Sequence, residues 1–500
     1  MVPSFCGTCL SRLRPTPRVL PSLTSAPRAA PFHTTAVLSS VLMKKKNRDA
    51  PAKKYRERTA FRMKKKRHVE RPRPPPAGER QALRKRIVLS NPNALEVKDM
   101  KDLSADTMIE ARLRGSVLGL PMPMLDQLRA SGAFKPHQGW AIFRRPGTVM
   151  RSETLEMGKN FHEITSEGAG KGKVFKRIIS GVRASGKTVH LLQAMTMAFA
   201  KKWVVFTVPE AQDLVIGHTT YTPISGTNPT LYAQADATAA LLSRVINSNR
   251  DVLSGLTVSR EHPSLRSTVK PGMKLTELAT VGTTDRAIAW TVFQALWTEL
   301  TATSPAPSLE KHFQPRPPIL VTVDGLAHWM KNTEYRTPEF QPIHAHDLAF
   351  VNHFLSLLKP GFEKPSLPNG GALVYALSTS NKPSVYALDV ALKQLEARQA
   401  GVDPKSPEFP QPDPYANADI RVIDALNVPK PKDAKEGALE VQTLGGLTRE
   451  ETRGYMEYFA RSGIMREKVS EESVSEKWTL AAGGVIGELE KLGKRVRVAA

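Results

Sequence analysis

Alternating strand and helix patterns occupy most of the chain after residue 165. Continuous runs of Val, Ile and Leu predict strands at residues 173–180, 202–208, 318–326 and 370–381, and a weaker one at 419–428. Helical spacing of apolar residues predicts helices at 187–200, 235–253, 283–301 and 346–358. Strands that are apolar throughout and alternate with helices are typical of a parallel sheet covered on both faces. The pattern therefore predicts an α/β core at residues 166–430, with a parallel sheet and helices on both faces.

The region before this core is less regular. Residues 89–165 combine helical spacing at 106–134 with a short β-type segment at 137–154, and a polar, Gly-rich connector follows at 161–173. We therefore expect a mixed helical and β extension ahead of the core.

The region after the core, residues 431–500, has the pattern of a small C-terminal helical lid. Its first predicted helix begins with a capping box formed by Thr448 and Glu451. Arg449 and Arg453 are expected on the outer surface of this helix rather than at a ligand. Its apolar face would consist of Tyr455, Tyr458 and Phe459.

Charge separates the N-terminal part from the rest of the chain. The formal net charge is +25 over 500 residues, and residues 1–90 hold 23 Lys and Arg against four acids, which is +19 of that total. The remainder has the composition of an ordinary globular protein. A polyanionic partner is therefore expected at the N-terminal part rather than at the core.

Residues 41–88 form a basic arm that we expect to be disordered and extended. Charge this dense repels itself unless an anion neutralises it, and each Lys or Arg that meets a phosphate releases counterions. Tyr55 and Phe61 interrupt the run and are suited to stacking on bases. Contact with ribosomal RNA is one interpretation, and a solvated charge run is the other. The side chains expected to contact RNA are Lys44, Lys45, Lys46, Lys53, Lys54, Arg56, Arg58, Lys64, Lys65, Lys66 and Arg67.

The first 40 residues have the composition of a mitochondrial transit peptide. No acid occurs before Asp49, and arginines are spaced through Ser, Thr, Leu and Ala, without the apolar run that a secretory signal requires. Cleavage is expected between Arg28 and Ser40. A basic tail of a nuclear or cytosolic protein is the alternative. Cys6 and Cys9 lie in this segment without a second pair of ligands, so they do not indicate a zinc site.

The stretch GVRASGKT, residues 181–188, carries the clearest chemistry in the chain. It matches the phosphate-binding pattern GxxxxGK[ST] and stands between a predicted strand and a predicted helix. The glycines allow backbone amides to face phosphate oxygens, Lys187 would neutralise the β- and γ-phosphates, and Thr188 would bind Mg²⁺. A plain Gly-rich turn is the alternative. The predicted nucleotide-binding residues are Gly181, Val182, Arg183, Ala184, Ser185, Gly186, Lys187, Thr188 and Val189.

A phosphate loop also needs a carboxylate to position the metal. The strand PILVTVDG ends in Asp324, which predicts a metal site formed by Thr188 and Asp324. An Asp-Gly turn at the end of a structural strand is the alternative. Many P-loop ATPases place a glutamate directly after this aspartate to activate water, whereas this chain has Gly325. The sequence therefore supplies no general base at that position.

The strand at 370–381 ends in Ser378, Thr379 and Ser380, which are candidates for sensing a γ-phosphate and are equally suited to ending a strand. The sequence NKPS that follows resembles a guanine-reading NKxD motif but has Ser384 in place of the aspartate, so it does not identify the base. His344 and His346 form an isolated HxH pair, which we expect to face solvent or to cap a turn rather than to bind metal.

Several of these segments together resemble one family, the mitochondrial small-subunit ribosomal protein S29 family, also called the death-associated protein 3 family. The segments are GWAIFRRP, IISGVRASGKT, PILVTVDGLAHWM, GGALVYALSTS and YMEYFARSGIM. The likeness, which is to a fungal member, covers about residues 110–500. It implies a P-loop NTPase (AAA+-like) fold with a helical lid, in the head of the mitochondrial small ribosomal subunit near the large subunit. It also implies a bound GTP or GDP with Mg²⁺, with ATP in some members.

The resemblance transfers the phosphate loop to Gly181–Thr188 and the metal-positioning carboxylate to Asp324. It implies small-subunit ribosomal RNA and other small-subunit proteins as partners, with no membrane and no DNA. Residues 182–185 match no residue pattern of the family, so the base and its hydrolysis are not assigned by it.

Two functions of different classes follow from these patterns. In the first, the protein is a structural component of the mitochondrial ribosome, in the matrix, and holds a nucleotide as a stabilising clamp. In the second, it is an active GTPase or ATPase that acts in subunit assembly or translation. A free RNA-binding or apoptosis-signalling factor is a third. The missing glutamate and the basic arm favour the clamp over a multiple-turnover enzyme.

Overall fold

The computed structural model describes residues 87–166, 172–306, 313–360, 365–379, 382–428 and 436–494. The expected transit peptide, the basic arm up to residue 86 with its predicted RNA contacts, and Ser380 lie outside these ranges. In the part described, no helix combines the length and the apolar character that crossing a bilayer requires.

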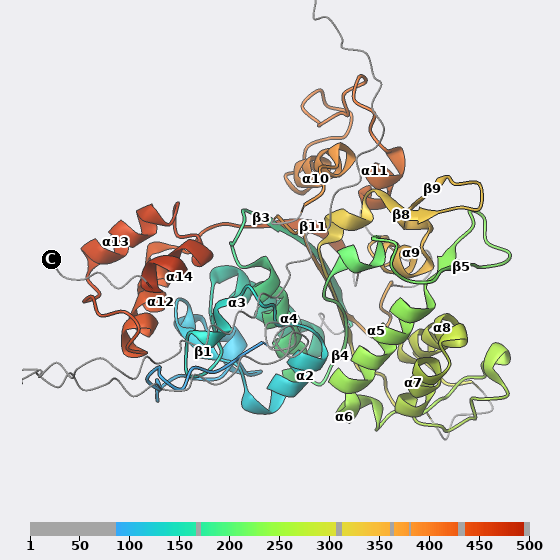
Figure 1. Cartoon of the computed structure of the whole chain (residues 1–500), viewed down its shortest axis with the longest axis horizontal. Coiled ribbons are helices and arrows are strands. Elements are labelled where there is room, and N and C mark those ends of the chain that lie inside the picture. The colour runs from blue at the N-terminus through green and yellow to red at the C-terminus, as the bar shows by residue number, and fades with distance from the viewer. Residues whose placement is uncertain are drawn as a thin grey trace, which may run out of the picture. The chain divides into compact units, whose positions relative to one another are not determined.

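A five-stranded parallel sheet forms the centre of the core (Figure 1). In spatial order, its strands are β11 Glu436–Leu444, β3 Val174–Gly181, β10 Gly371–Ala376, β7 Ile319–Asp324 and β4 Val204–Val208. Every neighbouring pair is parallel, so the carboxyl ends of the strands meet along one edge. Four of the five strands were expected from the apolar runs, and the parallel sheet is confirmed.

Both faces of this sheet are buried by helices. Neighbouring residues along a strand point to opposite faces, and accordingly Ile178 and Phe206 belong to one hydrophobic cluster while Ile179 and Val205 belong to another. The first cluster is covered by α5 Ala235–Ser248, α7 Leu275–Thr284, α8 Ala289–Leu300, α9 Ala349–Ser356 and α10 Tyr386–Gln399. The second is covered by α3 Ser152–Thr165 and α4 Lys187–Ala200 together with the extension. The predicted helices on both faces are confirmed.

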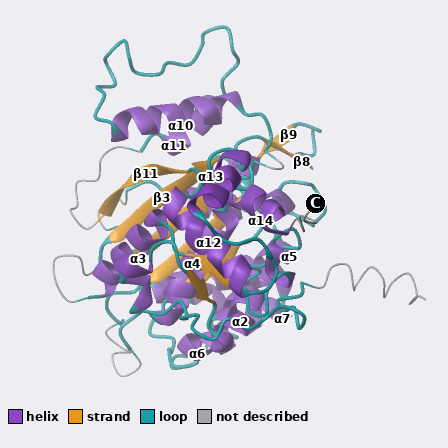
Figure 2. Ribbon diagram, turned by 90° about the vertical axis from the view of Figure 1, so that its left-hand side faces the viewer, coloured by secondary structure: helices purple, strands orange, loops and turns teal. Residues whose placement is uncertain are grey.

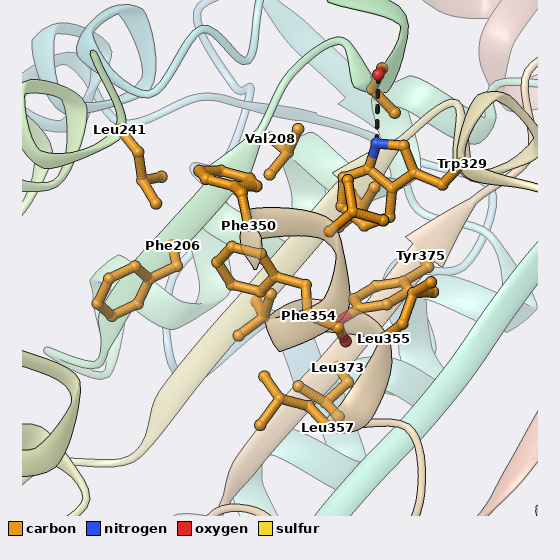
Figure 3. Close-up of a cluster of buried hydrophobic side chains, with 14 of the residues drawn as sticks. Phe206, Val208, Leu241, Trp329, Phe350, Phe354, Leu355, Leu357, Leu373 and Tyr375 are labelled. Carbon is orange, nitrogen blue, oxygen red and sulfur yellow. Dashed lines mark hydrogen bonds between the residues drawn. The ribbon is translucent and has the colours of Figure 1, made fainter. Parts of the chain in front are cut away.

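Aromatic packing in the first cluster also positions the segment that follows β4. The rings of Phe350 and Phe354 in α9 pack with centroids 5.1 Å apart, and the hydroxyl of Tyr375 in β10 donates to the carbonyl oxygen of Phe354 at 2.7 Å (Figure 3). The indole of Trp329, in the turn after β7, donates a hydrogen bond to the carbonyl oxygen of Ala211 at 3.2 Å. Because Ala211 follows β4, this contact holds the carboxyl ends of β4 and β7 together.

The strand β11 lies inside the region that we expect to be the lid, so the boundary at residue 431 is too early. It pairs with β3, and Figure 2 shows the two strands side by side. The ammonium of Lys176 donates to Oε1 of Glu436 at 2.7 Å, and both side chains are almost completely buried. This ion pair fixes the start of β11 to β3. The lid therefore begins after β11 and consists of α12 Arg449–Arg461, α13 Glu471–Leu480 and α14 Ile486–Lys494.

The weak strand expected at 419–428 is wrong, because this segment is the helix α11 Ile420–Leu426. The Asp419 side chain accepts the backbone N–H of Arg421 and so caps the helix. A short apolar run does not distinguish a strand from a buried helix. The remaining elements of the core are α6 Arg250–Leu253, β5 Thr222–Pro223, β6 Tyr232–Ala233, β8 Asn332–Arg336 and β9 Pro342–His344.

The extension contains less helix at 106–134 than expected and one helix that the pattern does not predict. Short 3₁₀ turns, β1 Val117–Gly119 and α2 Leu125–Ala130 replace the helical stretch, and β2 Gly147–Val149 pairs with β1. The unpredicted helix is α3, in which Gly158 interrupts the apolar pattern. A Cβ at Gly158 would lie 2.2 Å from the carbonyl oxygen of Met108. Glycine is needed there because the backbone of the extension passes directly over the helix.

Candidate functional site

The stretch GVRASGKT forms the turn between β3 and α4, as the sequence predicts. Gly181 and Gly186 have φ angles of 140° and 96°, and Ala184 has 63°, values that side chains rarely tolerate. A Cβ at Gly181 would also lie 2.4 Å from the carbonyl oxygen of Leu444, at the end of β11. The loop is therefore held against the sheet edge. The helix α4 begins at Lys187, so its unpaired N-terminal amides adjoin the loop.

Lys187 is buried and folds back over this loop. Its ammonium donates to the carbonyl oxygens of Gly181 and Val182, each at 2.8 Å, and to Oγ1 of Thr379 at 3.1 Å. Burial lowers the pKa of Lys187 to about 8, and the nearby carboxylate of Asp324 acts in the opposite direction. An anion beside this ammonium would favour its charged form.

The two residues predicted to position a metal are in direct contact. The hydroxyl of Thr188 donates to Oδ2 of Asp324, the last residue of β7, at 2.9 Å. Burial raises the pKa of Asp324. Lys135 is the largest charge that opposes this rise, and Glu210 adds to it. The carboxylate is thus held in a place where a neighbouring cation stabilises its charged form.

The strand order brings one of the sensor candidates to the same place. Because β10 lies between β3 and β7, its carboxyl end emerges between the loop and Asp324. Thr379 accepts a hydrogen bond from Lys187 there, and Ser378 lines the same cavity. Ser380 lies outside the described residues. Residues 378–380 were candidates either for sensing a phosphate or for ending the strand. The contact of Thr379 with Lys187 favours a role in the site.

A cavity of about 1100 Å³ opens above these residues. It is bounded by the loop, by the carboxyl ends of β4, β7 and β10, by residues 135–149 of the extension, and by α12 and α14 of the lid. Its volume and its position at the carboxyl ends of parallel strands are typical of ligand sites in α/β proteins. Of the nine predicted loop residues, those that line it are Arg183, Ala184, Gly186, Lys187, Thr188 and Val189.

The lid touches the loop directly through the start of α14. The backbone N–H of Gly487 donates to the carbonyl oxygen of Ala184 at 3.1 Å, and a Cβ at Gly487 would lie 2.6 Å from that of Ala184. Neither Arg449 nor Arg453 enters the site: Arg449 stacks on the ring of Trp478, and Arg453 pairs with acids of the lid. The expectation that these arginines lie on the outer surface of the helix is confirmed.

The extension ties the loop to the lid through Arg151. This buried guanidinium donates to the carbonyl oxygen of Ser185 at 2.9 Å and to that of Gly445, between β11 and α12, at 3.0 Å. One side chain therefore holds both the phosphate-type loop and the point where the lid leaves the sheet.

Glu451 ties the lid to the extension a second time. Its almost completely buried carboxylate accepts from Nε of Arg114 at 3.0 Å and from the backbone N–H of Ser152 at 3.1 Å. It also accepts the N–H of Thr448 at 3.0 Å, which completes the predicted capping box. In addition, Phe143 of the extension packs on Tyr458 (Figure 1 shows the lid beside the extension). Lid and extension therefore form one wall over the cavity.

Sequence reasoning missed one ion pair at the cavity. The ammonium of Lys135 donates to the carbonyl oxygen of Pro209 at 2.6 Å and to Oε1 of Glu210 at 3.0 Å. Glu210 follows the end of β4 by two residues, so the rule that parallel strands end at one edge offers a signal for it. Lys135, which is 75 positions away in the chain, has no such signal.

The histidine pair is a structural feature of another part of the core. His344 is buried, and its ring accepts the backbone N–H of His346. The capping interpretation is confirmed, whereas the solvent-facing one is wrong for His344. Within the described ranges, no group of three or more His, Cys, Asp or Glu side chains gathers as a metal site.

Replacing Asp324 by asparagine is expected to stabilise the ligand-free protein by about 0.5–2 kcal/mol at neutral pH. Asparagine keeps an oxygen for Thr188 but cannot ionise. The folded-state pKa of Asp324 lies above its ordinary value of 3.8. Ionisation of Asp324 therefore lowers the free energy of unfolding as pH rises from 3.8 through the folded-state pKa. The gain should therefore shrink as pH falls toward 3.8, which urea unfolding at several pH values would measure.

Asp126 is exposed, so Asp126→Asn provides the matched control, and its free energy of unfolding should differ little from that of the wild type. A clear loss of stability in Asp324→Asn at neutral pH would instead mean that the carboxylate contributes to holding the apo fold.

Comparison with known proteins gives two matches. Residues 148–492 match the family described as mitochondrial ribosomal death-associated protein 3. A relative from Neurospora crassa, named small ribosomal subunit protein mS29, is 40% identical over 429 residues, which cover 86% of this chain and 85% of the relative. The match to the family covers the loop, Asp324 and most of the lid.

Proposed function

Because the chain belongs to the mitochondrial ribosomal death-associated protein 3 family, we propose that it is a structural protein of the small subunit of the mitochondrial ribosome. Its place of action is the mitochondrial matrix, within the ribosome. The name of its relative supports this role, and so does the concentration of +19 of the net charge in the first 90 residues. Such an arm is suited to neutralising the phosphates of ribosomal RNA.

Within this role, the protein holds a guanine nucleotide with Mg²⁺ as a stabilising clamp. The observation that carries this proposal is the meeting of Lys187, Thr188, Asp324 and Thr379 at one end of the cavity. Burial lowers the pKa of Lys187 to about 8, so an anion beside its ammonium would favour the charged form. This ammonium adjoins the free amides at the start of α4, and together they fit an anion such as a phosphate. A buried carboxylate with a hydroxyl beside it fits a cation.

Each side chain has a separate task in such a clamp. The loop amides and Lys187 would hold the phosphates, and Thr188 and Asp324 would hold the metal. Thr379 would orient the terminal phosphate through its contact with Lys187. Mg²⁺ would supply charge neutralisation between the phosphate oxygens. The lid and the extension would exclude water from the cavity, because both are fixed over the loop by Arg151 and Glu451.

Two features favour a nucleotide-holding clamp over a protein that hydrolyses nucleotide repeatedly. Gly325 provides no carboxylate directly after Asp324. The lid is attached to the extension by hydrogen bonds of Arg151 and Glu451, whose side chains are buried. A ligand that binds only the folded protein stabilises it by about 2.7 kcal/mol at one hundred times its dissociation constant. An active GTPase or ATPase remains the second candidate, because Glu210 brings another carboxylate to the cavity.

In mitochondrial extracts at moderate salt, the protein is expected to sediment with the small ribosomal subunit, and to dissociate as salt rises because the arm binds phosphates. Denaturing extraction of the purified protein, followed by chromatography, should release a guanine nucleotide in near-stoichiometric amount. A free pool at moderate salt would contradict the ribosomal role, and an extract without nucleotide would contradict the clamp.

A further inference from the structure

Glu210 and Asp324 lie at the same carboxyl edge of the sheet. β4 and β7 are neighbours, Asp324 is the last residue of β7, and Glu210 follows the end of β4 by two residues. The contact between Trp329 and Ala211 holds the two strand ends in this arrangement. Both carboxylates line the cavity that also contains Lys187 and Thr188.

Among the described residues that line the cavity, the acids are Asp324, Glu210, Glu488 and Glu490. Asp324 accepts the Thr188 hydroxyl and would be committed to the metal. Glu488 and Glu490 belong to the lid helix α14, where they pair with lysines of the same helix at 2.6 and 2.5 Å. Glu210 is therefore the carboxylate on the core side that has no task in the clamp.

The only ion pair of Glu210 found in the described part is with Lys135, at 3.0 Å, and several contacts hold the segment that contains Lys135. The backbone N–H of Lys135 donates to Oε1 of Gln138 at 2.8 Å, and the indole of Trp140 donates to the same oxygen at 2.5 Å. Phe134 and Trp140 pack edge to face, with ring centroids 5.1 Å apart, and both are buried. The ammonium is thus held over Glu210 by the fold of the extension.

We propose that Glu210 is a water-activating carboxylate of this site and that Lys135 suppresses it, which keeps the protein a clamp. The inference rests on the proposed nucleotide clamp and explains its slow or absent hydrolysis. Unsuppressed, Glu210 would take a proton from a water whose oxygen bonds to the terminal phosphorus. The bond from that phosphorus to the bridging oxygen would break, which yields nucleoside diphosphate and inorganic phosphate.

The suppression has a geometric cause. The ammonium of Lys135 donates to Oε1 of Glu210 at 3.0 Å, so this oxygen is already occupied and is not available to accept a proton from water. The hydrogen bond from Lys135 to the carbonyl oxygen of Pro209, at 2.6 Å, keeps the ammonium in place next to Glu210. Removing the ammonium would leave Glu210 free to bind water.

The test uses four variants of the full mature protein: Lys135→Met, Glu210→Gln, the double variant, and Lys101→Met as a matched control. Lys101 lies on the same extension and pairs with Glu110 at 3.5 Å on the surface, away from the cavity. Multiple-turnover phosphate release from GTP should rise about a hundredfold in Lys135→Met, the lower part of the range for general-base catalysis. The rise should be absent in the double variant and in Glu210→Gln, and Lys101→Met, which lies outside the site, should remain at the wild-type rate.

A second readout does not depend on turnover. Nucleoside diphosphate with aluminium fluoride mimics the transferring phosphoryl group, so it should raise the melting temperature of Lys135→Met more than the diphosphate alone does. This extra rise should be absent in the double variant. Melting of the nucleotide-free variants shows whether each one folds.

The outcomes separate this inference from the proposed clamp. If wild-type protein releases no nucleotide on denaturing extraction, the clamp itself fails. If it does release nucleotide and Lys135→Met folds, binds nucleotide and hydrolyses no faster than wild type, only the suppression by Lys135 is overturned. A slower rate in Lys135→Met would also overturn it, because Lys135 would then be supporting phosphoryl transfer.

Discussion

A Lys187→Ala variant is expected to lose its nucleotide during purification and to melt about 3 °C below nucleotide-loaded wild type. The ammonium is the cation that adjoins the loop amides, so its loss removes the main attraction for the β- and γ-phosphates. Binding at one hundred times the dissociation constant contributes about 2.7 kcal/mol, and each kcal/mol shifts the melting temperature by about 1 °C in a compact unit that spans residues 75–500. Differential scanning fluorimetry and extraction of the bound nucleotide measure the two effects.

The same replacement should cost much less in nucleotide-free protein. Burial lowers the pKa of Lys187 from 10.5 to about 8, so the folded state disfavours the charged form. For a base with a depressed folded pKa, this penalty is fully present below about pH 8 and is relieved as pH rises toward 10.5. Nucleotide-free wild type should therefore gain stability relative to Lys187→Ala over that interval.

Lys173→Ala, which removes a half-exposed ion pair with Glu163 just before the same strand β3, is the matched control. It should retain nucleotide and melt like wild type, because surface ion pairs contribute little. If Lys187→Ala retained its nucleotide as Lys173→Ala does, the loop would not be the phosphate site.

The parts of the site that could be predicted are those encoded within a few neighbouring residues. The loop is one such part, because strand, glycines, Lys187 and helix follow one another directly. Asp324 is another, because an apolar strand ends at it. Thr379 was an ambiguous candidate until the strand order placed β10 between β3 and β7.

The parts that could not be predicted depend on contacts between residues far apart in the chain. Arg151 reaches Gly445 across 294 positions, and Glu451 reaches Ser152 across 299. No periodicity or composition indicates such pairs, since Arg151 and Glu451 taken alone resemble surface charges and their partners here are backbone groups. The strand β11 escaped prediction for a related reason: it is an edge strand with alternating rather than continuous burial, and the buried pair of Lys176 with Glu436 that fixes it spans 260 positions.

These long-range contacts make the lid a fixed part of the site. Glu451 contributes through its contacts with Arg114, Ser152 and Thr448. A Glu451→Ala variant is expected to lose about 1–3 kcal/mol of stability, because it leaves two backbone N–H groups without their acceptor; the lost ion pair with the exposed Arg114 adds little. It should also release nucleotide faster, since α12 would lose its charged attachment to the extension. Urea unfolding and the off-rate of a fluorescent nucleotide would measure the two effects.

The second capping box of the lid provides a matched control. Ser470 and Ser473 cap α13 in the same reciprocal way, but at an exposed site that touches neither the extension nor the loop. Ser473→Ala should therefore cost about 1 kcal/mol, the usual value of a cap, and leave the nucleotide off-rate unchanged. Equal losses of stability and equal off-rates in the two variants would mean that Glu451 acts only as a helix cap. A selective rise in the off-rate of Glu451→Ala would tie nucleotide retention to the attachment of the lid, as a clamp requires.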